Sequence, residues 1–340
     1  MCVKCNAKKS TINFSIINFL INTSEVPMTQ YHLAFVFPGQ GSQKIGMLAD
    51  LSSQYSLVAE TFSEASSALG YDLWDLVQNG SQDDINLTEC TQPLLLTASV
   101  AIWRVWQHKG GAQPAFLAGH SLGEWSALVC AGVVAFGDAV KLVQQRGKFM
   151  QEAVPAGQGA MAAIIGLDDG SIINACKQAE QGEVVAAVNF NSPGQVVIAG
   201  AAGAVERASA LCKEAGAKRA LPLPVSAPFH TSLMRPAAEK LAEQIYNTPF
   251  SVPDIPVVHN VTAAPESNPE KIKALMIEQI FSAVRWVDCV NTLSARGVAT
   301  TIECGPGKVL SGLNKRINKD LNTLSIETSE ELLGALKIFN

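Results

Sequence analysis

A serine between two glycines is the residue of this sequence best placed to do chemistry. The run Gly119-His120-Ser121-Leu122-Gly123 has the pattern G-x-S-x-G, between a short apolar run at 115–118 and a helical pattern that begins at Glu124. Between a strand and a helix, the glycines allow a sharp turn that exposes the serine oxygen, and the helix N-terminus favours a developing negative charge. The pattern therefore predicts a nucleophile at Ser121; the alternative is a tight turn whose serine caps the helix.

A serine nucleophile needs a base, and histidines are the first candidates. The five histidines are His32, His108, His120, His230 and His259. The first two lie at a strand start and a helix end, and His120 adjoins the serine, where neighbours on a turn point apart. His230 lies in a proline-stiffened loop, Val225-Ser226-Ala227-Pro228-Phe229-His230. From the residues alone His230 is favoured as the base and His259 remains the alternative.

A third feature is an arginine among mostly apolar neighbours. Arg146 lies in the helical pattern Leu142-Val143-Gln144-Gln145-Arg146-Gly147. Its guanidinium could form a bidentate pair with a substrate carboxylate. An ion pair with another side chain of the protein explains the position equally well.

The elements that must position these residues alternate between strands and helices. Apolar runs at 33–37 and 115–118 end in glycine-rich turns, and helical periods follow around 54–69 and 93–109. Strand–turn–helix repeats of this kind are typical of a parallel sheet with both faces covered by helices. Further strands are predicted at Val257-Val258 and Thr301-Ile302-Glu303.

The middle of the chain follows a different order. Strands are predicted at 161–165, 184–188, 195–199 and 219–223, and helices at 168–179 and 201–215. The run Asn191-Ser192-Pro193-Gly194 predicts a hairpin turn between the second and third of these strands. The order β-α-β-β-α-β is that of a ferredoxin-like unit. We therefore predict an α/β domain formed by 28–156 and 225–340, interrupted by a ferredoxin-like insert at 157–224.

The first residues fall outside this pattern. Lys4, Lys8 and Lys9 precede an apolar stretch, 12–21, that asparagines interrupt and no small-residue cleavage site follows. The stretch is too short and too polar to span a bilayer. Because Met28 directly precedes a strong strand, residues 1–27 are predicted to be an N-terminal extension, disordered or not native.

Composition and charge exclude several classes of protein. Of the 340 residues, 48% are hydrophobic and 16% charged, which excludes a largely disordered chain. The net charge of −5 argues against general nucleic-acid binding, which needs a basic face. Most of the eight cysteines are widely spread, as in a cytoplasmic protein with reduced thiols, and Cys2 and Cys5 have no partner pair. No metal site is predicted.

Five motifs, taken in order, resemble the malonyl-CoA:acyl-carrier-protein transacylases of bacterial type II fatty acid synthesis. They are Phe37-Pro38-Gly39-Gln40-Gly41-Ser42-Gln43, Gly119-His120-Ser121-Leu122-Gly123-Glu124, Gln144-Gln145-Arg146-Gly147, Pro228-Phe229-His230 and Gly305-Pro306-Gly307-Lys308-Val309-Leu310. The resemblance runs from about Met28 to the C-terminus. It implies an α/β-hydrolase-like fold with a ferredoxin-like insert. The implied reaction is ping-pong malonyl transfer from malonyl-CoA to the phosphopantetheine thiol of acyl carrier protein in the cytoplasm, without a cofactor or a membrane.

The resemblance also implies roles for single residues. Ser121 attacks the malonyl thioester, and His230 takes the proton of the serine and later protonates the departing thiolate. The backbone N–H groups of Gln40 and Leu122 form the oxyanion hole, which suits an elbow because the residue after the nucleophile supplies one donor. Arg146 pairs with the malonyl carboxylate.

Three further positions follow from the same resemblance. A backbone carbonyl that matches Gln279 orients the histidine, and Asn191 matches a position near the site. Phe229 departs from the smaller residues of many bacterial members. A bulky residue there resembles the malonyl-selecting pattern of related polyketide acyltransferase domains.

The acyl carrier protein is acidic in this resemblance, so an acidic transferase needs a local basic patch to meet it. The candidate patches are Lys315 with Arg316, and Lys218 with Arg219. The alternative is that these residues form an ordinary solvated charged surface.

Different functions remain open at this stage. A serine esterase or thioesterase of the α/β-hydrolase type shares the elbow and needs an acidic residue between Ser121 and His230. The acidic residues there include Asp138, Asp168, Asp169 and Glu206, most of them in the predicted insert. A hydrolase gives no reason for Arg146. A binding module without catalysis and an acyltransferase for methylmalonyl or longer units are also open.

Overall fold

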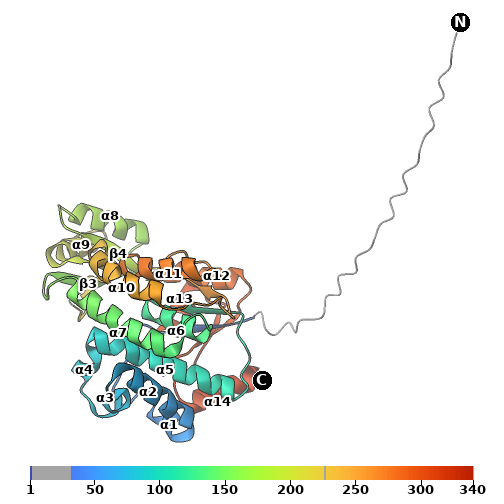
Figure 1. Cartoon of the computed structure of the whole chain (residues 1–340). Coiled ribbons are helices and arrows are strands. Elements are labelled where there is room, and N and C mark those ends of the chain that lie inside the picture. Colours follow the sequence, from blue (N-terminus) through green and yellow to red (C-terminus); the bar gives the residue numbers. More distant parts are fainter. Residues whose placement is uncertain (2–31, 226, 340) are drawn as a thin grey trace.

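The computed structural model describes residues 1, 32–225 and 227–339 (Figure 1). The predicted extension at 1–27, together with Met28, Cys2 and Cys5, therefore lies outside the described residues, apart from Met1. In the described residues the chain forms two sheets, one parallel and one antiparallel.

The larger sheet is parallel throughout and has the strand order β7-β2-β1-β8-β9. Its strands are β1 (Leu33–Phe37), β2 (Phe116–Gly119), β7 (Val257–Val258), β8 (Thr300–Glu303) and β9 (Asn322–Ser325). This confirms the predicted parallel sheet. Strand β9 was not predicted, because its four residues include one apolar side chain and it lies at the edge of the sheet.

Helices cover both faces of this sheet (Figure 1). They are α1 (Ala49–Gln54), α2 (Ser56–Leu69), α3 (Leu73–Asn79), α4 (Gln82–Asn86), α5 (Thr88–His108), α6 (Leu122–Cys130), α7 (Phe136–Glu152), α10 (Arg235–Asn247), α11 (Pro269–Glu278), α12 (Trp286–Ala295), α13 (Val309–Ile317) and α14 (Ser329–Phe339), with 3-10 turns η2 (Ser232–Met234) and η3 (Gln279–Phe281). The central strand β1 shows why both faces are needed. Phe35 and Phe37 belong to the core with α5 and α6, whereas Ala34 and Val36 belong to the core with α12 and α13. Successive side chains of a strand point to opposite faces, so an unbroken apolar run requires two covers.

The smaller sheet is antiparallel and has the order β4-β5-β3-β6. Its elements are β3 (Gly159–Ile165), α8 (Asp169–Ala179), β4 (Val185–Ser192), β5 (Gln195–Ala201), α9 (Ala202–Glu214) and β6 (Arg219–Pro222). This confirms the predicted ferredoxin-like order, including the hairpin and the acidic N-cap of α8, where the Asp168 side chain accepts from Ser171 N. We call Gly159–Pro222 the ferredoxin-like region and the rest of the described chain the parallel-sheet region. The domain boundaries at 157 and 224 stay a prediction.

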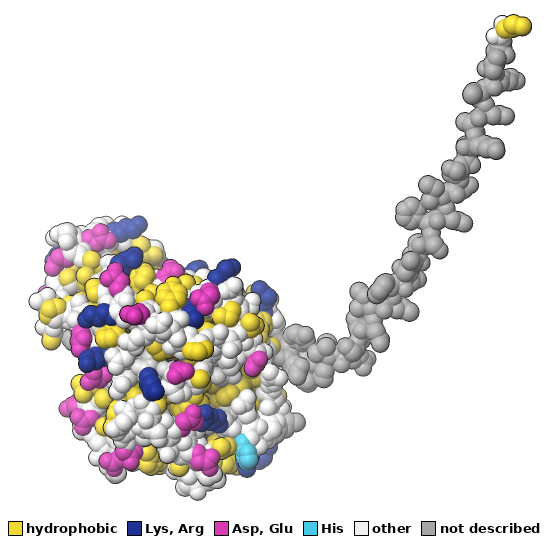
Figure 2. Space-filling view, in the orientation of Figure 1, with side chains coloured by type: hydrophobic (Ala, Val, Ile, Leu, Met, Phe, Trp, Pro, Cys, Tyr) yellow, Lys and Arg dark blue, Asp and Glu magenta, His cyan; other side chains and the backbone are white. Residues whose placement is uncertain are grey.

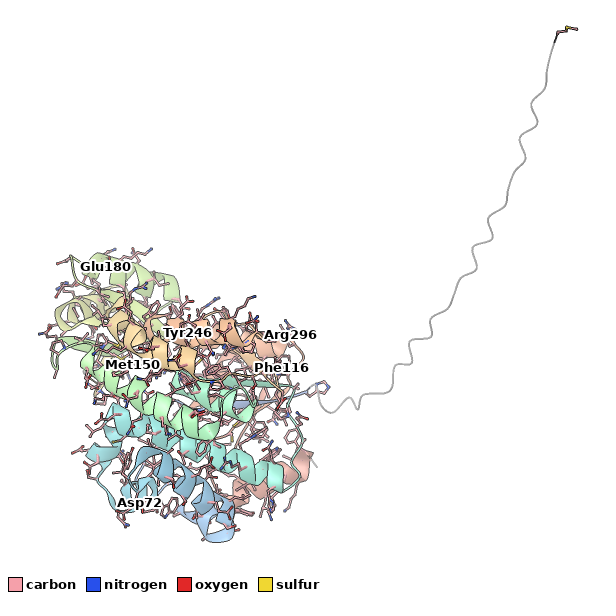
Figure 3. The ribbon with its side chains drawn as sticks, in the orientation of Figure 1. Asp72, Phe116, Met150, Glu180, Tyr246 and Arg296 are labelled. Atoms are coloured by element: carbon pink, nitrogen blue, oxygen red, sulfur yellow. The ribbon has the colours of Figure 1, made fainter. Side chains whose placement is uncertain are left out.

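The two regions are joined along β4. Val284, just ahead of α12, donates its N–H to Val188 O at 2.8 Å and accepts from Phe190 N at 3.0 Å. Strand β4 therefore lies beside α12 and α13, two helices of the parallel-sheet region. Figure 3 marks Glu180 in the ferredoxin-like region and Phe116 and Arg296 in the parallel-sheet region.

In residues 32–225 and 227–339, none of the helices combines the length and the apolar character needed to cross a membrane.

Candidate active site

Ser121 lies at a sharp turn between β2 and α6. Its backbone has φ 51° and ψ −105°, in a region that costs energy for a residue with a side chain. A Cβ on Gly119 would lie 1.9 Å from the carbonyl carbon of Gly123, and one on Gly123 would lie 2.0 Å from Phe37 O, so only glycine fits at either position. The Ser121 side chain makes no capping bond to α6, and its backbone N–H donates to Asn260 Oδ1 at 2.8 Å. The hydroxyl is therefore left for other contacts.

His230 is the histidine that reaches this serine. Its Nε2 lies 2.8 Å from Ser121 Oγ, and its Nδ1 lies 2.9 Å from the backbone O of Gln279. Because a carbonyl only accepts, the proton of the ring lies on Nδ1 and Nε2 is free to take the serine proton. His230 also has a positive φ, 63°, so the backbone at both partners of the pair is strained.

The electrostatic surroundings keep His230 neutral. Burial lowers the pKa of His230 to about 3, and the nearby positive charge of Arg146 adds to the effect. The imidazole is therefore present as a free base at neutral pH. His259, the alternative base, is fully buried and its Nδ1 bonds to Glu124 Oε1 at 2.7 Å.

Arg146 approaches Ser121 from the other side. Its guanidinium is buried, and Nη2 lies 3.2 Å from Ser121 Oγ. Two amide oxygens hold it: Gln92 Oε1 at 2.8 Å from Nη1 and Gln279 Oε1 at 2.9 Å from Nη2. Burial lowers the pKa of Arg146 to about 10, which still leaves it charged at neutral pH. Within the described part of the chain no carboxylate forms a direct ion pair with Arg146.

The two predicted oxyanion donors belong to the elbow itself and to the loop that contacts it. Leu122 is the first residue of α6, so its N–H has no acceptor within the helix. Gln40 follows Gly39, where a Cβ would lie 2.6 Å from His120 O, so this loop rests on the backbone of the elbow. The pairing of the two N–H groups at one oxyanion stays a prediction.

A cleft of about 250 Å³ opens beside the elbow, between the two regions. It is lined by the loop at 38–42, His120 and α13 on one side and by the ferredoxin-like region and Leu223 on the other, where the residues are Ala163, Asn189, Asn191, Gln195, Val197 and Leu223. Asn191 Oδ1 lies 2.8 Å from His120 Nε2. The ferredoxin-like wall of the cleft therefore offers neutral amides rather than charges.

The remaining predicted residues lie farther from the serine. Phe229 is buried in the principal hydrophobic core, and its contact with an acyl group stays a prediction. Lys315 and Arg316 are exposed in the last turn of α13, whose first turn lines the cleft, and Lys218 and Arg219 are exposed around the start of β6. Figure 2 shows basic and acidic side chains interspersed over the visible face, with no broad basic area on it.

Sequence reasoning assigned no role to three residues that contact this machinery. Glu124 bonds to Gln279 Nε2 at 2.7 Å, Asn260 bonds to Gly119 O and Ser121 N of the elbow, and Gln92 holds Arg146. Glu124 had a signal, because it is the one charged residue of the apolar helix α6. Asn260 lies two residues after the end of β7, at the carboxyl edge where functional side chains gather in parallel sheets. Gln92 carried no comparable signal.

Ser121 Oγ therefore has a neutral base, His230, and a buried guanidinium, Arg146, within hydrogen-bond distance. Known proteins with similar sequences and structures show which enzymes share this arrangement. The family described as "Acyl transferase domain" matches residues 34–337. The chain belongs to the acyl transferase family. A relative named malonyl CoA-acyl carrier protein transacylase, from Escherichia coli strain K12, is 58% identical over 311 residues, which cover 92% of this chain and 100% of the relative.

Solved structures of other acyltransferases agree with this membership. An acyl carrier protein S-malonyltransferase from Vibrio cholerae has a TM-score of 0.88 and 62% identity, covering 89% of this chain and 99% of its own. A malonyl-transacylase solved in complex with its type II PKS acyl-carrier protein has a TM-score of 0.89 and 55% identity, covering 90% and 99%. Membership in this family makes the chain an acyltransferase and supports the α/β fold with two sheets.

Proposed function

We propose that the chain transfers the malonyl group from malonyl-CoA to the phosphopantetheine thiol of an acyl carrier protein, through an ester on Ser121, in cytoplasmic fatty acid biosynthesis. The observation that carries the proposal is that Ser121 Oγ has the His230 base at 2.8 Å and the Arg146 guanidinium at 3.2 Å. Ester hydrolysis needs no buried cation beside the nucleophile, whereas an acyl group that ends in a carboxylate does.

The first half of the reaction makes the ester. Ser121 Oγ attacks the thioester carbonyl carbon while His230 Nε2 takes the hydroxyl proton. The carbon–sulfur bond then breaks, and the thiolate of coenzyme A leaves with that proton. The N–H groups of Leu122 and Gln40 are the donors we assign to the oxyanion of the tetrahedral intermediate.

The second half repeats these steps in reverse order. The carrier thiol gives its proton to His230 Nε2, and its sulfur attacks the ester carbonyl. Ser121 leaves as the alcohol after it regains the proton from His230. Both halves exchange a thioester for an oxygen ester or back, so the chain needs no cofactor, and coenzyme A is part of the substrate.

Arg146 selects the acyl group. Nη1 donates to Gln92 Oε1 and Nη2 donates to Gln279 Oε1, and each of these nitrogens carries a second N–H group. Nη2 also contacts Ser121 Oγ, so a guanidinium donor lies beside the nucleophile. In a malonyl thioester one methylene separates the carboxylate from the thioester carbonyl. This carboxylate could accept one N–H group from Nη1 and one from Nη2 of Arg146 as a bidentate pair.

The cleft suits the arm that the two substrates share. Coenzyme A and the carrier both present phosphopantetheine, a neutral chain with two amide groups. The wall formed by Asn189, Asn191 and Gln195 offers amide donors and acceptors for such a chain. One wall thus serves both halves of the reaction, as a ping-pong mechanism requires.

The carrier would dock where the cleft opens. The complex of a relative with its acyl-carrier protein supports such a partner. We assign the basic ends of α13 (Lys315 and Arg316) and β6 (Lys218 and Arg219) to the acidic carrier. Six cysteines of the described chain are free thiols, which supports a reducing compartment such as the cytoplasm.

Intact mass spectrometry after mixing with malonyl-CoA tests the proposal, beside Ser121→Ala as the control. We expect the wild type alone to gain one malonyl group, and added acyl carrier protein to remove it. Release of free malonate without a carrier would instead indicate a hydrolase. A wild type that gains no malonyl group would refute malonyl transfer.

A further inference from the structure

Behind the site lies a buried carboxylate that the reaction steps above do not use. Glu124 is 1% exposed and accepts three hydrogen bonds. The donors are His259 Nδ1 at 2.7 Å, Gln279 Nε2 at 2.7 Å and Asn260 N at 3.1 Å. Both carboxylate oxygens of Glu124 are therefore used as hydrogen-bond acceptors.

His259 contacts this carboxylate through one ring nitrogen. Its Nδ1 bonds to Glu124 Oε1, and its buried Nε2 has no hydrogen-bond partner among the described residues. His259 therefore contacts Glu124 from the side away from Arg146's partner Gln279, which bonds to the other carboxylate oxygen, Oε2.

The side chain of Gln279 connects this carboxylate to Arg146. Its Nε2 donates to Glu124 Oε2 and to Ser121 O, and its Oε1 accepts from Arg146 Nη2. A carboxylate can only accept and a guanidinium can only donate, so the amide fits between them in one orientation. The backbone O of the same residue accepts from His230 Nδ1.

The other buried carboxylates of the described chain are engaged elsewhere. Glu303 accepts from Leu310 N and Ser311 N at the start of α13, and Glu327 pairs with Lys44. Glu124 is thus the buried carboxylate linked to Arg146, one side chain away from direct contact.

We propose that Glu124 is a positioning residue for malonyl selection: through the Gln279 amide it fixes the guanidinium of Arg146 beside Ser121 and balances its charge from a distance. This inference rests on the proposed malonyl transfer. The spacing is the essential feature. A carboxylate in direct contact with Arg146 would occupy the N–H groups that the malonyl carboxylate needs, whereas no carboxylate at all would leave a buried cation uncompensated.

A double-mutant cycle tests this role. We expect Glu124→Gln to lower kcat/KM for malonyl-CoA about tenfold or more. The new amide N–H group would face the donors that now bond to the carboxylate, so the Gln279 side chain would lose the contact that holds it. In the Arg146→Ala background, again with malonyl-CoA as the substrate, the same substitution should change kcat/KM less than about twofold. The malonyl-to-acetyl preference should fall in Glu124→Gln, which a purely structural loss would leave unchanged.

Glu303→Gln is the matched control, because it also neutralises a fully buried carboxylate of the parallel-sheet region. Glu303→Gln should lower kcat/KM by the same factor in the wild-type and Arg146→Ala backgrounds. It should leave the malonyl-to-acetyl preference unchanged. Equal losses from Glu124→Gln in both backgrounds, with an unchanged preference, would overturn the inference while leaving malonyl transfer intact. A wild type that forms no malonyl ester would refute the proposed function itself.

A second variant covers the case in which Glu124→Gln does not fold, as judged by thermal unfolding. Gln279→Met removes the amide link but keeps Glu124 and the backbone carbonyl that holds His230. We expect the malonyl-to-acetyl ratio of kcat/KM to fall in Gln279→Met as it does in Glu124→Gln. An unchanged preference in a folded Gln279→Met variant would contradict the relay.

Discussion

The parallel-sheet region and the ferredoxin-like region face each other across the cleft beside the elbow and differ in the side chains they hold near it. The parallel-sheet region holds the strained Ser121 and His230 and the buried Arg146 and Glu124. The ferredoxin-like side contributes amides and small apolar side chains. The difference indicates that covalent chemistry and acyl selection lie on one side, and that the other binds what all substrates share.

The largest expected effect that distinguishes the two sides comes from Arg146→Ala. We expect the preference for malonyl-CoA over acetyl-CoA to fall by about 2–5 kcal/mol, roughly 30-fold or more, because the partner of the malonyl carboxylate is lost. The preference of Arg146→Lys should lie between those of the wild type and Arg146→Ala, because lysine keeps the positive charge but cannot form the bidentate pair. The ratio of kcat/KM values for the two thioesters measures this, and an unchanged ratio would remove Arg146 from acyl selection.

The pH dependence sharpens the same side of the comparison. Burial and then the charge of Arg146 lower the pKa of His230 to about 3, so the base form persists at pH values where an ordinary histidine is protonated. We expect kcat/KM to remain high below pH about 6.5. With acetyl-CoA as the substrate of both proteins, the acid limb of Arg146→Ala should lie at higher pH than that of the wild type, because one of the causes that lower the pKa of His230 is removed.

Exposed His108 provides the control for that experiment, since His108→Gln should leave the acid limb where it is. An acid limb that moved toward lower pH in Arg146→Ala would have the wrong sign for this electrostatic explanation.

Substitution on the ferredoxin-like side should have a smaller effect on KM, and the effect should be the same for malonyl-CoA and acetyl-CoA. We expect Asn191→Ala to raise KM for both malonyl-CoA and acetyl-CoA by roughly two- to tenfold, the cost of one hydrogen bond at His120. Gln178→Ala, an exposed amide on α8, is the matched control. A change in the malonyl-to-acetyl ratio in Asn191→Ala would break the proposed division of roles.

The smallest effect should come from the basic end of α13. Reversing Lys315 and Arg316 to glutamate should raise KM for the carrier roughly threefold at low ionic strength, without changing KM for malonyl-CoA. Reversal of the exposed Lys141 and Lys177 controls for net charge. If both pairs of reversals act alike, the carrier docks elsewhere.

The sequence predicted best what is local along the chain. The turn around Ser121 is encoded by glycines whose Cβ atoms would collide with neighbouring backbone, and the ferredoxin-like order follows from alternating short elements. Edge strand β9 was not predicted, because a short, polar, partly exposed strand shows little apolar pattern in the sequence.

What depends on contacts across long stretches of chain could not be read from the residues. Ser121 and His230 are 109 residues apart, and the residues alone favoured His230 but left His259 as a rival base. The Gln279 side chain was hidden for the same reason, because only the folded chain shows that it lies between Glu124 and Arg146.

The most direct measurement is a competition for Ser121 between equal amounts of malonyl-CoA and acetyl-CoA, read by intact mass in the wild type, Arg146→Ala and Asn191→Ala. We expect the wild type to carry malonyl, Arg146→Ala to shift toward acetyl, and Asn191→Ala to load both more slowly in the wild-type proportion. A wild-type proportion in Arg146→Ala, or a shifted one in Asn191→Ala, would contradict the division of chemistry between the two regions.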